Sequence, residues 1–146
     1  MSFPPFVQQA YTFGNYKDNL VLYGIPASGF EYIRSYDRNG WQNLSGGLDK
    51  INIQSINSFA WNNEMLWACG SFSLKSNQAS ASLMYYLPSS GWVLDDELLK
   101  NQCLKLGQYD SKAVLIGDYT SFYNQNLNHI SEISAFTAMI RGSVYH

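Results

Sequence analysis

Three short apolar runs that each end in a glycine recur along this chain at nearly constant spacing. The runs are Leu20–Gly24, Leu66–Gly70 and Ala113–Gly117, so their glycines lie 46 and 47 residues apart. Four consecutive apolar residues before a turn residue are typical of a buried strand and fall well short of an ordinary helix. A repeat with such a strand at its centre predicts an all-β chain built from similar units.

The residues before each run keep the same register. Apolar residues stand eleven and fourteen positions before each glycine, with polar turn residues in between. The positions are Phe13, Phe59 and Leu106, then Ala10, Ile56 and Cys103, and the turns occupy 14–19, 62–64 and 108–112. This pattern predicts a first strand joined by a hairpin to each glycine-ended strand, which is then the second of its unit and covers about 19–24, 65–70 or 113–117.

Alternating segments follow each run, at 30–37, 80–87 and 132–140. Alternation of apolar and polar residues predicts a half-buried strand. In the first two units a glycine and a tryptophan come next, as Gly40-Trp41 and Gly91-Trp92, and predict a turn that opens a fourth strand.

Four short strands with a period in the forties are typical of a propeller blade, because tetratricopeptide and ankyrin repeats are shorter and helical. We therefore predict a single all-β domain over 1–146, with three four-stranded antiparallel repeats at about 6–48, 49–95 and 99–146. The third repeat stops without the tryptophan, which predicts a partial propeller. A β-sandwich is the alternative fold.

Composition limits the classes of partner. Aromatic residues make up 16% of the chain and charged residues 14%, against about 25% charged in typical soluble domains. The formal net charge is −2 and neither sign forms a block, so we expect no nucleic-acid partner. No run of 18 apolar residues occurs, so we expect no membrane segment in this chain.

The spacing of tyrosine and tryptophan resembles kelch-type repeats, in which a glycine-ended strand is followed by a Tyr and, some six residues later, a Trp. Tyr36 precedes Trp41 by five residues, and Tyr86 precedes Trp92 by six. Kelch repeats carry two adjacent glycines at the strand end, whereas this chain has one. The resemblance implies a kelch-like β-propeller, of which this chain supplies part.

A narrower resemblance is to the kelch-like extracellular region of fungal cortical marker proteins for bud-site selection and cell polarity. It rests on an aromatic residue two positions after the glycine and on a series that links repeats. These motifs are Gly70-Ser71-Phe72, Gly117-Asp118-Tyr119, Tyr36-Asp37, Trp41 and Gly46-Gly47-Leu48. Pro26 departs from the pattern, and the third repeat lacks the Tyr-Asp and Trp. The resemblance implies a cell-surface location and a fragment of a longer, membrane-anchored protein.

Residues for catalysis are sparse. His129 and His146 are the only imidazoles, and Cys69 and Cys103 are not at metal-ligand spacing. The run 95–97 (Asp-Asp-Glu) could bind Ca²⁺ or act as paired carboxylates, but a solvated loop is the favoured interpretation. The longer segment 95–102 could form a short helical turn, although a loop between repeats is favoured there too. Gly46-Gly47 lacks the spacing of a phosphate-binding loop and predicts a turn between repeats. We expect no enzyme, no metal site and no cofactor.

The remaining features favour binding. We predict a non-catalytic protein-interaction module with a protein partner, and the alternative is a lectin-like module that binds glycans. The candidate sugar contacts are Tyr16, Tyr119, Phe122 and Tyr123. Because Trp41 and Trp92 recur at equivalent places, they predict packing rather than sugar stacking. An open array of repeats also predicts self-association or dependence on further chain. The two cysteines suit buried thiols or one disulfide, and Asn43 begins a single glycosylation sequon.

Overall fold

The computed structural model describes residues 7–26, 32–62, 65–95, 102–109 and 112–118, and the short segments 121–122, 125–126 and 130–132. These residues form antiparallel strands, and the one helical element among them is a short 3₁₀ turn, η1 (Leu48–Lys50). Within the same residues no helix has the length and apolar character needed to cross a bilayer. The predicted all-β class is confirmed.

Each of the first two sheets is an up-and-down meander of four strands in sequence order. The first contains β1 (Val7–Tyr16), β2 (Asn19–Pro26), β3 (Tyr32–Asp37) and β4 (Gly40–Asn43). The second contains β5 (Ile51–Asn62), β6 (Met65–Leu74), β7 (Ser80–Leu87) and β8 (Gly91–Leu94).

The third sheet has three strands in the order β13, β10, β9, and a small hairpin accompanies it. Its strands are β9 (Gln102–Tyr109), β10 (Lys112–Asp118) and β13 (Ile130–Glu132), and the hairpin is β11 (Ser121–Phe122) with β12 (Gln125–Asn126). The glycine-ended runs lie in β2, β6 and β10, so all three predicted second strands are confirmed.

Two sequence-based boundaries need correction. The first hairpin turn is only Lys17 and Asp18, both with positive φ, so residues 14–16 continue β1. A two-residue turn of this kind matches the twist of the paired strands, and the Asn15 side chain accepts the Asp18 N–H at 3.1 Å. In the third sheet the strand that pairs with β10 starts at Ile130, before the predicted segment 132–140, most of which lies outside the described residues.

The turns before the fourth strands are as predicted. Gly40 and Gly91 open β4 and β8, with φ values of 119° and 80°. Residues with a Cβ rarely adopt this conformation, so glycine is the residue that allows each chain reversal.

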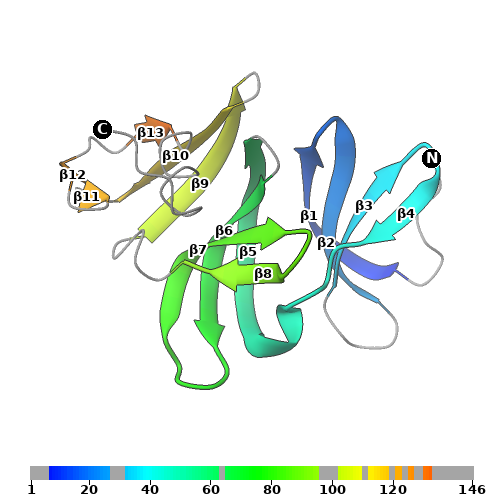
Figure 1. The fold of residues 1–146 in the computed structure, drawn as a ribbon, viewed down its shortest axis with the longest axis horizontal. Helices are drawn as coiled ribbons and strands as arrows, with labels where there is room; N and C mark the ends of the chain where they lie inside the picture. The colour runs from blue at the N-terminus through cyan, green and yellow to red at the C-terminus, as the bar shows by residue number, and fades with distance from the viewer. Residues whose placement is uncertain are drawn as a thin grey trace.

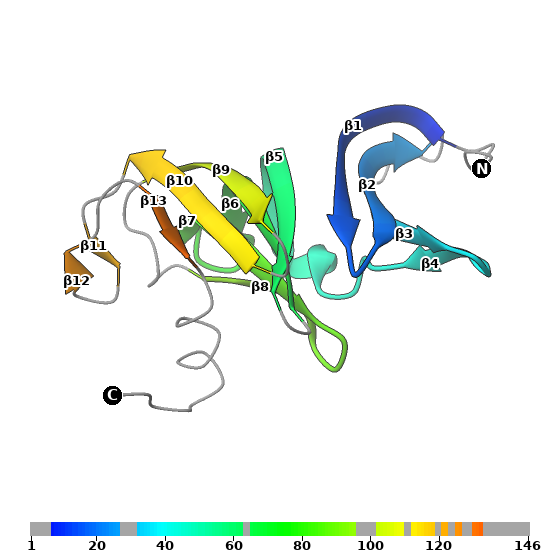
Figure 2. The same cartoon turned by 90° about the horizontal axis from the view of Figure 1, so that it is seen from above.

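The three sheets stand in a row with the second between the other two (Figures 1 and 2). The first strands make this contact, since β1 lies against β5 and β5 against β9. An apolar layer fills each interface. Val21, Tyr23, Ile33, Phe59 and Phe72 contribute to the first layer, and Trp67, Leu83, Leu106 and Leu115 to the second. The described sheets form an open row rather than a closed ring.

The repeat glycines pair with the first strand of their own sheet at the same register. Gly24 faces Ala10, Gly70 faces Ile56 and Gly117 faces Cys103, each beside a register shift. A Cβ on Gly70 would collide with the carbonyl oxygen of Ser55 and the backbone of Ile56. The glycine is thus needed because the bulged first strand approaches the second too closely for a side chain.

Candidate functional site

The two repeat tryptophans lie at equivalent places but are unequally covered. Trp41 pairs across the strands with Tyr36 and Trp92 with Tyr86, with ring centroids 5.1 and 5.4 Å apart. Trp92 is 3% exposed, whereas Trp41 is half-buried. These contacts give both residues a packing role, with Trp92 carrying the larger share.

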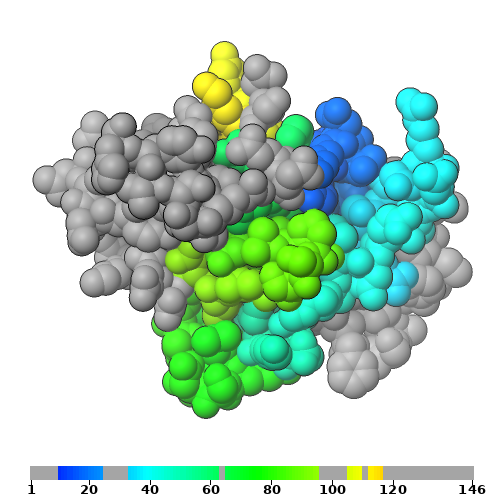
Figure 3. Space-filling view, in the orientation of Figure 1, coloured from blue at the N-terminus to red at the C-terminus, as the bar shows by residue number. Residues whose placement is uncertain are grey.

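Trp92 also binds the linker that joins the first two sheets. Its indole Nε1 donates to the carbonyl oxygen of Leu44 at 2.6 Å, and its backbone N–H donates to that of Gly46 at 2.8 Å. Gly47, with a φ of 83°, sits directly against the Trp92 backbone. The Gly-Gly pair is therefore an inter-sheet turn, as predicted, and the space-filling view shows the second sheet in contact with this part of the chain (Figure 3).

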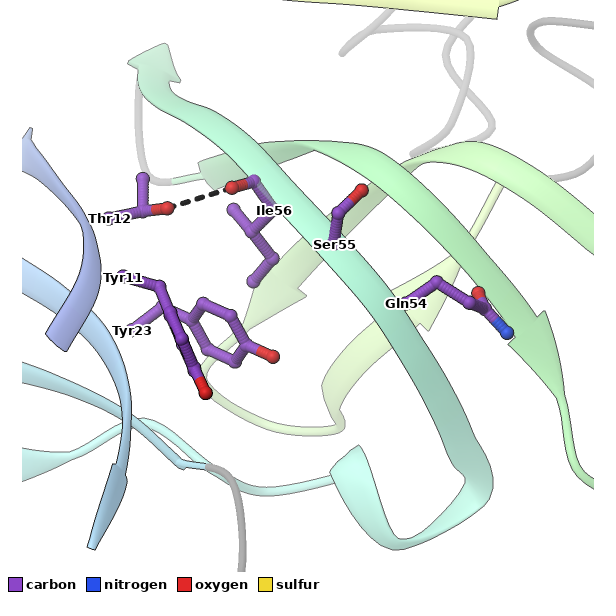
Figure 4. A pocket seen from close by; sticks show the side chains of 6 residues that line it. All are labelled: Tyr11, Thr12, Tyr23, Gln54, Ser55 and Ile56. Atoms are coloured by element: carbon purple, nitrogen blue, oxygen red, sulfur yellow. Dashed lines mark hydrogen bonds between the residues drawn. The ribbon is translucent and has the colours of Figure 1, made fainter. Parts of the chain in front are cut away.

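A cavity of about 390 Å³ opens between the first two sheets and is the candidate binding site, called here the inter-sheet cleft. Its lining comes from β1, β2 and β5 (Figure 4). The lining residues are Tyr11, Thr12, Tyr23, Gln54, Ser55 and Ile56.

Strand bulges place two of these side chains. Tyr11 falls in the register shift between Ala10 and Thr12, and Gln54 in the shift between Ile53 and Ser55. A bulged residue leaves the regular pleat, and bulges commonly re-aim side chains next to functional sites. The cleft thus forms where the irregular parts of two adjacent first strands face each other.

The chemistry of the cleft is neutral and polar. The rings of Tyr11 and Tyr23 lie 5.5 Å apart at an interplanar angle of 38°, and Tyr11 is 46% exposed. The Thr12 hydroxyl donates to the Ile56 carbonyl oxygen at 2.7 Å and fastens the two sheets at the cleft wall (Figure 4). The six lining residues include no Asp, Glu, Lys, Arg or His. The arrangement suits a neutral ligand with a flat apolar face and hydrogen-bonding groups.

The sugar contacts expected from the sequence do not assemble at this cleft. Tyr16 was expected in an exposed loop, but it is 9% exposed in β1 and packs in the apolar layer, so that assignment is wrong. Tyr119, Tyr123 and the Phe122 side chain lie outside the described residues. Tyr11 and Gln54 stand out in no sequence motif, and the one regularity near them is that Gln8 and Gln54 both lie sixteen positions before a repeat glycine.

The other candidate groups have structural surroundings where they are described. Cys69 is a buried thiol facing the third sheet, and Asn43 is exposed, with its Oδ1 accepting the Ser45 N–H at 2.8 Å. Within the described ranges, no cluster of three His, Cys, Asp or Glu side chains could hold a metal ion. His129, His146, Asp96, Glu97 and the Cys103 side chain lie outside these ranges.

Asp95 is buried beside Tyr85 at the end of the second sheet. Burial raises the pKa of the Tyr85 phenol, and the negative charge of Asp95 raises it further. Both effects disfavour the phenolate, so Tyr85 stays protonated at neutral pH.

Comparison of the chain with family models, characterised proteins and solved structures finds no match in any of the three. The fold and the geometry of the cleft are therefore the basis for assigning a function.

Proposed function

We propose that this chain is part of a kelch-type β-propeller and acts as a non-catalytic protein-interaction module. The supporting observation is that adjacent sheets repeat one register, with glycine paired to the same position of a bulged first strand. Four-stranded meanders standing side by side are how propeller blades are arranged. Two apolar layers flank the second sheet, whereas a two-sheet sandwich has one, which favours blades over the alternative fold.

The inter-sheet cleft is the proposed contact with the protein partner. It is held between rigid strands, and Tyr11 presents an exposed aromatic ring at its mouth. Tyrosine is enriched at protein interfaces because it combines a large apolar surface with a hydroxyl group. The narrower sequence resemblance extends this proposal to a role in fungal cell polarity or bud-site selection at the cell surface.

Glycan binding is the second candidate, and one observation favours it. The cleft places the exposed Tyr11 ring beside the Tyr23 ring and the Thr12 hydroxyl group (Figure 4). A sugar ring offers an apolar face for an aromatic side chain and hydroxyl groups for neutral hydrogen-bonding partners. The same cleft would then hold a saccharide in place of a peptide segment.

A photo-crosslinking experiment on intact fungal cells tests the proposed function. A photoreactive phenylalanine analogue replaces Tyr11 in one version of the chain and the exposed turn residue Ser76 in a matched control. We expect one protein to be crosslinked from position 11 alone. Equal crosslinking from both positions would argue against the cleft. Binding to a glycan array that disappears in Tyr11→Ala would support the saccharide instead.

A further inference from the structure

The exposed large apolar side chains gather on the two outer sheets. Among the residues whose burial the structure describes, they are Tyr11 and Phe13 in the first sheet and Tyr109 and Ile116 in the third. Phe13 is 51% exposed, Tyr109 74% and Ile116 41%. The second sheet contributes none, because neighbouring sheets cover both of its faces.

Strand alternation places Phe13 on the outward face of the first sheet. A Cβ on the next residue, Gly14, would lie 2.6 Å from the Phe59 Cβ, so Gly14 faces the second sheet. Successive residues of a strand point to opposite faces. Phe13 therefore points away from the second sheet.

The same reasoning applies at the other end of the row. Leu106 and Leu115 pack in the layer against the second sheet. Gly107 and Ile116 follow them directly in β9 and β10 and therefore face outward. Tyr109 shares this outward face, because the residue before it, Gln108, hydrogen-bonds to Trp61 in the second sheet.

Both internal interfaces place a large side chain against a small one at equivalent positions. Phe59 packs on Gly14 between the first two sheets, and Leu106 shares a cluster with Ala60 between the second and third. The large residue stands eleven positions before its repeat glycine and the small one ten. The outer faces continue the series, with the large Phe13 at one end and the small Gly107 at the other. A Cβ on Gly107 would meet no atom of the described residues within 4 Å.

We propose that a second copy of this chain docks head to tail. The outward face of its first sheet, where Phe13 is exposed beside the buried Leu22, meets the outward face of the third sheet of the first copy, at Gly107, Tyr109 and Ile116. The chain carries both halves of the contact, so a second copy can supply either half, and the contact continues the packing already seen between its own sheets. Such an interface uses two different surfaces and builds rings or open filaments. The inference does not depend on what the inter-sheet cleft binds.

Polar side chains also recur at equivalent positions of the three sheets, and they limit the strength of the proposed contact between copies. Gln108 bonds to both the N–H and the carbonyl oxygen of Trp61 at 2.7 and 3.0 Å, and the Trp61 indole donates to Asn15 at 2.9 Å. Asn15 of the docking copy occupies the corresponding place next to Gln108. Arg34 and Asn43 stand where the second sheet has Met84 and Leu94, so we expect weaker packing than inside the chain.

Sedimentation velocity on the full chain and two charged variants tests the proposal. We expect wild type to form species larger than a monomer at micromolar concentrations, and Phe13→Arg and Gly107→Arg each to remain monomeric. An equimolar mixture of the two variants should form dimers and nothing larger, because one intact face remains on each. Ser76→Arg is the matched control and should behave as wild type.

Thermal melting of each variant checks that the substitution leaves the fold intact, as expected for outward positions. If Gly107→Arg lowers the melting midpoint, Ile116→Arg on the same face replaces it in the mixture. A monomeric wild type, continued association of Phe13→Arg, or a mixture of folded variants that stays monomeric would overturn the head-to-tail contact.

Discussion

The first and second sheets are built alike but differ in what covers them. Both are four-stranded meanders with a tyrosine paired to a tryptophan across β3 and β4 or β7 and β8. The second sheet is covered on both faces, so Phe59 is 6% exposed, while its counterpart Phe13 is 51% exposed. The energetic value of a repeated residue is therefore decided by the neighbouring sheet rather than by its own motif.

The sharpest contrast is between Trp92 and Trp41. We expect Trp92→Ala to lower the free energy of unfolding by about 3 to 5 kcal/mol, because it empties a buried site and removes the bond to Leu44. Trp41→Ala should cost only about 1 kcal/mol, since the ring is half-buried. The sequence predicts packing for both residues, and the structure shows that their burial is unequal. Urea unfolding measures both, and equal losses would mean that the first sheet is covered as fully as the second.

Glycines at equivalent sheet positions should respond in opposite directions. Gly14→Ala puts a Cβ against Phe59 and should destabilise the fold by about 2 to 3 kcal/mol. Gly107→Ala meets open space in the described structure and should stabilise β9 by about 0.5 to 1 kcal/mol. Chemical denaturation of the two variants provides the test, and a destabilised Gly107→Ala chain would show that the outward face of the third sheet is closely covered.

Hydroxyl side chains on β5 and β1 each form a hydrogen bond to the neighbouring sheet, and the bond at Ser58 is more deeply buried than the bond at Thr12. Ser58 accepts the buried Leu106 N–H at 2.6 Å, so Ser58→Ala should cost about 1 to 2 kcal/mol by leaving that donor unsatisfied. Thr12→Val removes a partly buried bond to Ile56 and should cost about 0.5 to 1 kcal/mol. Hydrogen exchange of the Leu106 amide should accelerate in Ser58→Ala and remain unchanged in Thr12→Val. Unchanged exchange in Ser58→Ala would contradict the assigned bond.

The smallest expected effect is on how the stability of the second sheet depends on pH, through Tyr85. The pKa of Tyr85 is raised above about 10, so the unfolded chain loses this proton at a lower pH than the folded chain. Its contribution to stability is complete below pH 10 and is lost as the pH rises from there toward the folded-state pKa. We expect Tyr85→Phe to lose less stability than wild type between neutral and alkaline pH, as followed by urea unfolding. Parallel curves would exclude the raised pKa.

The strands could be predicted from sequence because the glycine-ended runs carry a local signal. Four apolar residues before Gly24 or Gly70 define a buried strand wherever they occur, and the turns at Gly40 and Gly91 need a conformation that glycine adopts readily. Positions fourteen residues before each glycine proved to be its cross-strand partners. Apolar runs, turn glycines and a constant period were therefore sufficient to predict the strands and the pairing of the first two strands in each sheet.

The inter-sheet cleft could not be predicted in the same way. The cleft forms beside register shifts in two adjacent first strands, at Tyr11 and at Gln54, and no short sequence pattern encodes how those strands align across two sheets. Tyr16 was misassigned because the turn after β1 is shorter than the polar run around it. Likewise, Trp41 and Trp92 have similar local sequences, and only the arrangement of whole sheets separates them.

The bonds from Trp92 to Leu44 and Gly46 also set an order of events during synthesis of the chain. The indole and the Leu44 carbonyl are 48 residues apart in sequence, so the ribosome needs roughly 2 to 10 s to add the intervening stretch at ordinary elongation rates. During that interval β1 can already pack against β5 and Thr12 can bond to Ile56, but the linker cannot yet be held by Trp92. The linker between the sheets is thus the last part of this half of the molecule to become secured.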